Sequence, residues 1–458
     1  MTRTEQIITL SLASIYAFRM LGLFMILPVF AVYASTLQLA TPFLVGQALG
    51  IYGLTQALLQ IPFGMSSDHL GRKPVIFFGL ILFALGSILA ALSHSIEGII
   101  IGRALQGAGA IGSTITALLA DLIPDEERLK AMSVIGMTIG LSFIIAMILG
   151  PLLTGMIGVP GIFWLTAVLA LLGMIILSTL VPTPKRLLLH RDTEPVLNQF
   201  TKILTNLELL RLDAGILILH ASLTAMFIVI PSILLQNNIP LAKQWVIYLP
   251  VLILAFMCMM PFIIIAEKKR CLKETFIGAI IILIITQGLL WLFHFNVVMI
   301  AIILIFFFAA FTFLEASLPS LIAKISPAGN KGTAMGVYSS SQFLGIFIGG
   351  VVGGSIVHYF NFKQVFMFGT LLGISWLLFA ITMKSPRYLS SKVITIGLLK
   401  DRESAKVLQT KLLTIKGIID VLVCPDEGVA YLKIDNTLFA NNDLINFLKS
   451  QGETYGKR

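Results

Sequence analysis

Twelve long apolar stretches limit what this chain can fold into. A helix needs about 20 apolar residues to cross the hydrocarbon core of a bilayer, and each stretch has roughly that length. The predicted spans cover residues 8–33, 44–64, 74–92, 98–121, 131–155, 162–181, 213–235, 244–265, 275–294, 297–319, 333–357 and 364–383. Only 12% of the 458 residues are charged, about half the usual share in soluble proteins. The sequence therefore predicts an α-helical, multi-pass membrane protein and excludes a soluble enzyme.

Lys and Arg are distributed very unevenly between the two sets of connecting loops. Nineteen of them, counted through Lys392, lie on the side of the N-terminus, and two, Lys243 and Lys363, lie on the other side. Because cytoplasmic loops carry an excess of Lys and Arg, we expect both termini in the cytoplasm of a cell with the protein in its inner membrane. The basic residues are scattered between apolar runs, which excludes a nucleic-acid-binding surface.

The spans divide into two halves of six. A long loop at residues 182–212 separates an N-terminal half, residues 1–181, from a C-terminal half, residues 213–384. The segment that begins at Pro124 is repeated in the segment that begins at Pro327, at a constant offset of 203 residues. Two halves in the same orientation, related about the membrane normal, are a transporter architecture.

The composition changes after the last span, in residues 392–458, which contain no run of span length. Alternation and turn signals predict strands at 393–397, 418–424 and 429–435 and helices at 401–414 and 441–449. This β-α-β-β-α order predicts a small, cytoplasmic, ferredoxin-like module. One candidate partner of this module is a small ligand. Weak docking of its acidic turn at 425–428 against the basic loops of the membrane part is another.

A charged turn with two glycines connects the second and third spans. It reads Gly64-Met-Ser-Ser-Asp68-His-Leu-Gly71-Arg72-Lys73. This spacing resembles motif A of the major facilitator superfamily, whose members are transporters with two six-helix halves. The residues alone also allow the simpler interpretation that these charges only set the topology of a tight turn.

Two further stretches resemble motifs of the drug:proton antiporter branch of that superfamily. Motif B corresponds to Arg103, Gln106 and Gly107 in the fourth span, and motif C corresponds to Gly150, Pro151 and Gly155 in the fifth span. Ala146 and Thr154 stand where motif C usually has glycines, which keeps symport open beside antiport. Nearly the whole chain resembles YajR-type transporters, whose C-terminal part is called the YAM domain.

The resemblance implies a conformational latch at the cytoplasmic face. Asp68 would accept backbone N–H groups at the start of span eleven, near Gly332, where the helix dipole favours an anion. Arg72 would pair with Asp121 at the inner end of span four. The latch would stabilise the outward-facing state, and its release would allow the two halves to rock.

Four Arg, His or Glu side chains lie inside the ends of the predicted spans and are candidates for binding substrate or protons. A charge at mid-bilayer costs about 2.5–3.5 kcal/mol on insertion scales and usually faces a cavity. Arg19 and Arg103 are the cationic candidates, against the alternatives of a structural arginine and of snorkelling to the interface. His220 and Glu315 are the candidates for proton transfer, against the alternative of helix packing.

The sequence thus predicts a proton-coupled secondary transporter that exports small amphipathic or drug-like solutes by alternating access. Its partners would be the lipid bilayer, protons and an unidentified small solute. The sequence shows no phosphate-binding loop and no metal-binding spacing of its three cysteines, so no cofactor or metal is expected. Two alternatives remain open. One is a proton-coupled importer of a metabolite, and the other is a non-transporting membrane sensor that signals through the C-terminal module.

Overall fold

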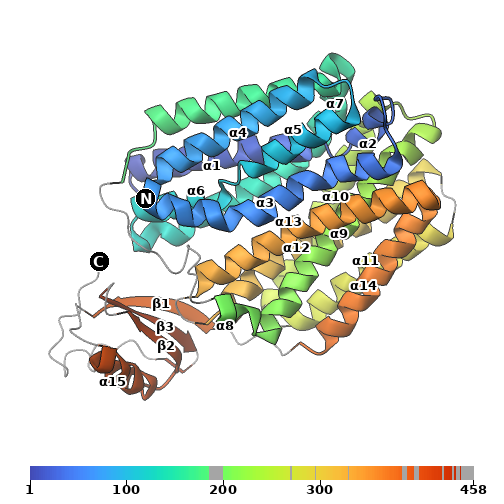
Figure 1. Ribbon diagram of the computed structural model, residues 1–458. Coiled ribbons are helices and arrows are strands. Elements are labelled where there is room, and N and C mark those ends of the chain that lie inside the picture. The colour runs from blue at the N-terminus through green and yellow to red at the C-terminus, as the bar shows by residue number, and fades with distance from the viewer. Residues whose placement is uncertain are drawn as a thin grey trace.

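The helices form two bundles that lie side by side, with a small sheet-containing module at one end (Figure 1). The computed structural model describes residues 1–184, 200–268, 271–293, 296–327, 330–383, 389–396, 402–424, 428–435, 438–439 and 444. The N-terminal bundle is coloured blue to green and the C-terminal bundle yellow-green to orange. We call the end that carries the module the module end, and the opposite end the far end.

The N-terminal bundle begins with a capped helix, in which Thr2 and Glu5 exchange side-chain hydrogen bonds with each other's backbone N–H group. Its helices are α1 (Arg3–Phe24), α2 (Phe30–Ala34), α3 (Pro42–Leu70), α4 (Arg72–Leu92), α5 (Ile96–Ala108), α6 (Gly112–Leu122) and α7 (Asp125–Thr179). Thr41 caps α3 by accepting from Leu44 N at 3.3 Å, directly before a proline at the first helical position.

The C-terminal bundle contains six long helices, one for each of the predicted spans seven to twelve. Its elements are α8 (Phe200–Leu204), α9 (Leu207–Gln236), the short 3₁₀ helix η2 (Leu241–Lys243), α10 (Trp245–Lys268), α11 (Leu272–Leu292), α12 (Val297–Ile325), α13 (Lys331–Tyr359) and α14 (Phe362–Ile381). Asn206, Asn296 and Asn361 cap the starts of α9, α12 and α14 with their side-chain oxygens.

The predicted twelve spans are present, although some are not single helices. Ten described helices are long and apolar enough to cross a membrane. One of them, α7, contains both predicted spans five and six, and the chain turns between them at Gly158, whose φ of +68° suits glycine. Span four is divided into α5 and α6, which together supply the remaining crossing. The expected helical membrane fold with two halves and a small α+β module is confirmed.

The two bundles approach each other most closely where α3 lies beside α13 at the far end. A Cβ atom at Gly46 would lie 2.2 Å from the Gly350 carbonyl oxygen and 2.7 Å from Gly354 Cα. The contact extends to mid-helix, where Ser340 Oγ donates to the Ala57 carbonyl at 3.2 Å. The backbones therefore touch, and the far end is closed in this conformation.

The C-terminal module contains a three-stranded antiparallel sheet in the order β1-β3-β2. Its elements are β1 (Leu389–Thr395), α15 (Arg402–Leu413), β2 (Ile418–Cys424) and β3 (Val429–Asp435). The bounds of β2 and β3 are the predicted ones, whereas β1 begins four residues before the predicted Val393. Ala405, Leu408 and Leu412 of α15 pack into the core of the sheet. Residues 425–427 of the predicted turn at 425–428 and nearly all of the predicted helix at 441–449 lie outside the described residues.

Candidate transport and coupling site

A small cavity lies between the two bundles, near the middle of the helices. Its volume is about 20 Å³, which is room for a water molecule and not for a larger solute. Leu23, Phe24, Leu27, Leu49 and Arg103 line it from the N-terminal bundle, and His220, Leu223, Thr224 and Ile346 line it from the C-terminal bundle. Two of the ionisable residues singled out in the sequence therefore face one cavity from opposite halves.

Arg103 of motif B is held inside the N-terminal bundle by neutral groups. Its Nη1 donates to Gln106 Oε1 at 3.0 Å, and its Nε donates to the Ala48 carbonyl at 3.4 Å. The guanidinium carbon lies 4.9 Å from the centre of the Tyr52 ring, within range of a cation–π interaction. Gln106 Nε2 in turn donates to Ser87 Oγ at 2.7 Å. Arg103 is 2% exposed, which excludes snorkelling to the interface in this conformation.

Gly107, the remaining motif B residue, brings α5 against α3. A Cβ atom at this position would lie 2.3 Å from the Tyr52 carbonyl oxygen. The tight contact fixes Tyr52 beside Arg103. Motif B therefore supplies both the cation and the packing that holds its aromatic neighbour in place.

Arg19 lies in α1 and is also 2% exposed. Its Nη2 donates to Gln56 Oε1, and Gln56 Nε2 donates to Gln60 Oε1 at 3.0 Å. Phe83 lies beside the guanidinium, and the centre of its ring is 5.9 Å from Arg19 Cζ. The Nε and Nη1 atoms of Arg19 are buried without a hydrogen-bond partner among the described residues.

Gln342 joins Glu315 to His220, and sequence reasoning missed it. The Gln342 side-chain nitrogen lies 2.9 Å from Glu315 Oε1 and 2.9 Å from His220 Nε2. Its two hydrogens can be donated to both acceptors at once when His220 is neutral and protonated on Nδ1. His220 is 3% exposed and lines the cavity, whereas 32% of the Glu315 side chain is exposed. The three residues come from α12, α13 and α9. The chain of contacts therefore leads from Glu315, whose side chain is partly exposed although its Oε2 atom is buried, to the cavity.

Asp213 is a second buried carboxylate that the sequence analysis did not select. It is 4% exposed, and neither of its carboxylate oxygens has a hydrogen-bond partner among the described residues. The Tyr338 hydroxyl lies within electrostatic reach of both Asp213 and Glu315. Because α9 begins at Leu207, ahead of the predicted span, Asp213 lies well inside the helix and not at its edge.

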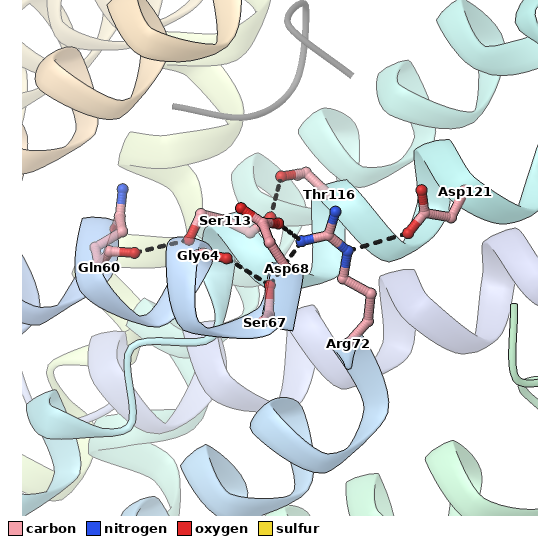
Figure 2. Close-up of polar contacts among 8 residues, drawn as sticks. All are labelled: Gln60, Gly64, Ser67, Asp68, Arg72, Ser113, Thr116 and Asp121. Carbon is pink, nitrogen blue, oxygen red and sulfur yellow. Dashed lines mark hydrogen bonds and ion pairs between the residues drawn. The ribbon is translucent and has the colours of Figure 1, made fainter. Parts of the chain in front are cut away.

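The motif A residues gather around Arg72 at the module end (Figure 2). Arg72 Nε donates to Asp121 Oδ2 at 3.0 Å, and its Nη1 donates to Ser67 Oγ at 2.7 Å and to Asp68. The Arg72 and Asp121 side chains are 1% and 0% exposed, whereas that of Asp68 is 27% exposed. Gly71, with φ +93°, makes the turn between α3 and α4. This arrangement ties spans two, three and four together.

The contacts of Gly64, Lys73 and Asp68 complete motif A. The Gly64 carbonyl accepts from Ser67 Oγ at 2.6 Å, and Lys73 Nζ donates to the Val181 carbonyl at 2.7 Å, which connects α4 to the end of span six. The resemblance implied that Asp68 binds the start of span eleven. Among the described residues, its hydrogen-bond partner is Arg72 and not the start of α13.

The motif C residues take part in helix packing and do not line the cavity. A Cβ atom at Gly150 would lie 2.3 Å from the Met25 carbonyl oxygen, where α7 crosses the break after α1. One at Gly155 would lie 2.7 Å from Ala242 Cβ of η2, in a contact between the two bundles at the far end. Pro151, which follows Gly150 in α7, is also buried. The motif therefore shapes how span five meets its neighbours in both halves.

The C-terminal module contacts the end of α12 through one buried lysine. Lys433 of β3 is 3% exposed, and its Nζ donates to the carbonyls of Ala323 and Lys324 at 2.7 and 3.2 Å. A cation at the C-terminus of a helix is favoured by the helix dipole and by the free carbonyls of the last turn. The described contact thus reaches the helix that carries Glu315. The predicted docking of the acidic turn on the basic loops stays a prediction, because residues 425–427 and 185–199 lie outside the described residues.

Comparison with known proteins agrees with this architecture. The family model of the Major Facilitator Superfamily matches residues 12–350 and 272–413. The chain belongs to the major facilitator superfamily. A superfamily member from Escherichia coli strain K12, the inner membrane transport protein YajR, is 45% identical over 436 residues, which cover 95% of this chain and 96% of that protein. The C-terminal module is consistent with the YAM domain of such transporters.

Other known proteins resemble the chain more distantly. An uncharacterized transporter of Buchnera aphidicola subsp. Acyrthosiphon pisum is 36% identical over 75% of this chain and 88% of its own length. The quinolone resistance protein NorA of Staphylococcus aureus is 30% identical over 36% of this chain and 43% of its own length. The solved structure of the nucleoside transporter NupG has a TM-score of 0.64 at 14% identity, covering 82% of this chain and 99% of that one. That similarity shows the common fold.

Proposed function

We propose that this protein is a proton-coupled transporter that exports small amphipathic solutes across the inner membrane by alternating access. The observation that carries the proposal is the contact of Glu315 with Gln342 and of Gln342 with His220, which ends at the cavity between the two bundles. Superfamily membership supports transport, and the geometry supports a place where proton binding and solute binding meet.

In this proposal Glu315 carries the proton. Its partly exposed side chain takes up or releases a proton, and Gln342 passes the change in hydrogen bonding to His220 at the cavity wall. Asp213 and Tyr338 extend the same set of polar groups toward the module end. Movement of one proton across the membrane supplies about 2.3 kcal/mol per 100 mV of membrane potential, enough to drive the cycle in one direction.

The closed far end fits one of the two end states of alternating access. We place the module end in the cytoplasm, because most Lys and Arg residues of the loops lie on that side. The close contact of Gly46 with Gly350 then closes the outer side. The pairing of Asp68 with Arg72, and not with α13, fits a motif A latch that is released in this state and would engage in the outward-facing one.

Glu315→Gln tests the proton role directly. In proteoliposomes, the variant should lose solute accumulation driven by a pH gradient. It should keep exchange of solute without a gradient, because glutamine preserves the size and the contact with Gln342. Glu274→Gln is the matched control, since Glu274 is an exposed residue in the first turn of α11. Accumulation at the parental level in Glu315→Gln would remove Glu315 from the coupling mechanism.

A further inference from the structure

The N-terminal bundle holds two buried cations that no carboxylate of the described residues neutralises. Arg19 and Arg103 are each 2% exposed, and neither forms an ion pair with a described Asp or Glu residue. A guanidinium group stays protonated in proteins. This half of the site therefore presents two permanent positive charges in a part of the protein where uncompensated charge is costly.

The hydrogen-bonding capacity of these cations is only partly used. Arg19 has two buried nitrogens, Nε and Nη1, without an acceptor, and the buried Tyr52 hydroxyl likewise has no partner among the described residues. Tyr52 lies under the Arg103 guanidinium. Unpaired buried donors are rare in proteins, because each forfeits the hydrogen bonds it made in water. The arrangement leaves two side chains, Arg19 and Tyr52, able to donate to an acceptor that the described residues do not supply.

The buried carboxylates of the other bundle do not fill this role. Glu315 contacts Gln342, and Asp213 lies near Tyr338, both within the C-terminal bundle. A carboxylate also loses its charge when it binds a proton, whereas an arginine keeps its charge. The positive charge of Arg19 and Arg103 therefore persists through a proton-coupled cycle. An anionic group that binds and dissociates in each cycle would neutralise it.

We propose that the transported solute is an organic anion with an apolar body. Its anionic group would bind Arg103 at the cavity wall, with Arg19 and Tyr52 as the next donors toward the module end. Its apolar body would lie against Leu23, Leu27 and Leu49, which line the cavity from the N-terminal bundle, once the two bundles move apart and widen that cavity. This inference rests on the proposed transport function and adds the chemical class of the solute.

Three naphthalene compounds of similar shape test the charge requirement. Naphthalene sulfonate is a permanent anion, naphthalene sulfonamide is neutral, and naphthyl trimethylammonium is a permanent cation. Calorimetry on the full-length protein in nanodiscs should show that the sulfonate binds about tenfold or more tightly than the other two, as expected for charge-assisted hydrogen bonds. Methanesulfonate, which lacks the apolar body, should bind at least about tenfold more weakly than naphthalene sulfonate.

Variants then assign the preference to the two arginines. Arg19→Gln and Arg103→Gln should each weaken sulfonate binding about fivefold or more, while sulfonamide binding stays unchanged and reports that the site is folded. Arg19→Lys keeps the charge and should retain the preference for the anion. Lys243→Gln, at an exposed position of η2 at the far end, is the control and should change nothing.

Two kinds of result would overturn the inference. The first kind shows that charge recognition by the arginines is absent. Either the neutral or the cationic compound then binds as tightly as the sulfonate, or sulfonate binding is unchanged in both Arg→Gln variants. The other is methanesulfonate binding as tightly as naphthalene sulfonate, which would indicate a site for a simple ion. These binding measurements need no pH gradient. Proton-coupled movement of the trimethylammonium compound would refute the anion assignment and leave the proposal of proton-coupled transport standing. Sulfonate binding without proton movement would support the anion assignment and refute proton-coupled transport.

Discussion

Gly46→Ala is designed to open the closed far end. The added methyl group would lie 2.2 Å from the Gly350 carbonyl oxygen and 2.7 Å from Gly354 Cα. Both are backbone atoms, so the overlap is relieved only when α3 and α13 move apart. Overpacking a close contact costs about 1–3 kcal/mol, which shifts an equilibrium between two conformations about 5- to 150-fold. We therefore expect the population to move toward the conformation that is open at the far end.

Spin labels at the far end of each bundle measure this shift. Thr36→Cys, just after α2, and His358→Cys, in the last turn of α13, are exposed positions. With the three native cysteines replaced by serine, electron–electron distance measurements in nanodiscs should show a longer distance between the labels in Gly46→Ala than in the parent. Gly136→Ala is the matched control, since a Cβ atom there meets nothing within 4 Å.

An unchanged distance distribution in Gly46→Ala would refute this reasoning, because the closed contact would then not hold the two bundles together. The same shift in Gly136→Ala would refute it equally, since the effect would come from replacing a helical glycine and not from the contact with α13. Loss of binding of naphthalene sulfonamide in either variant would indicate a fold defect, so that compound serves as the folding control.

Two further predictions concern the module end. Asp68→Asn should lower the transport rate while expression and thermal stability stay near the parental values, because the variant loses the charged acceptor of the proposed latch; parental transport would identify Asp68 as a topology charge. Lys433→Met removes the donor to the Ala323 and Lys324 carbonyls, hydrogen bonds worth about 1.5–3 kcal/mol when one partner is charged. Hydrogen exchange at the end of α12 should then rise relative to Lys406→Met, an exposed position of α15, and equal exchange in both variants would argue against docking through Lys433.

Most of the fold could be predicted from the sequence, because the signals that define it act over whole spans. Span length and loop charge depend on averages over some twenty residues, and the alternation in β2 and β3 gave their bounds. The interruptions of spans one and four could not be predicted in this way. They arise at single positions such as Pro28, where a proline leaves the helix without an N–H donor, and they depend on which helix lies alongside.

The polar residues of the site were predicted unevenly. Charged residues inside apolar runs, such as Arg103 and Glu315, stand out because their burial is costly. Gln342 has no such signal, since an uncharged amide in a span rich in small residues gains its meaning only from the two other helices that bring it acceptors. Lys433 has the sequence pattern of a surface lysine on a strand, and only the position of the module against α12 shows that it is buried.

Proton movement during solute transport tests the central claim most directly. Proteoliposomes that contain a pH-sensitive dye, with the membrane potential held at zero, would receive naphthalene sulfonate or naphthyl trimethylammonium on the outside. For an antiporter, entry of the solute drives protons out, so the lumen should become more alkaline with the sulfonate, and this change should be absent in Glu315→Gln. Acidification of the lumen would indicate symport, and no pH change with either compound, beyond that of protein-free liposomes, would contradict proton-coupled export.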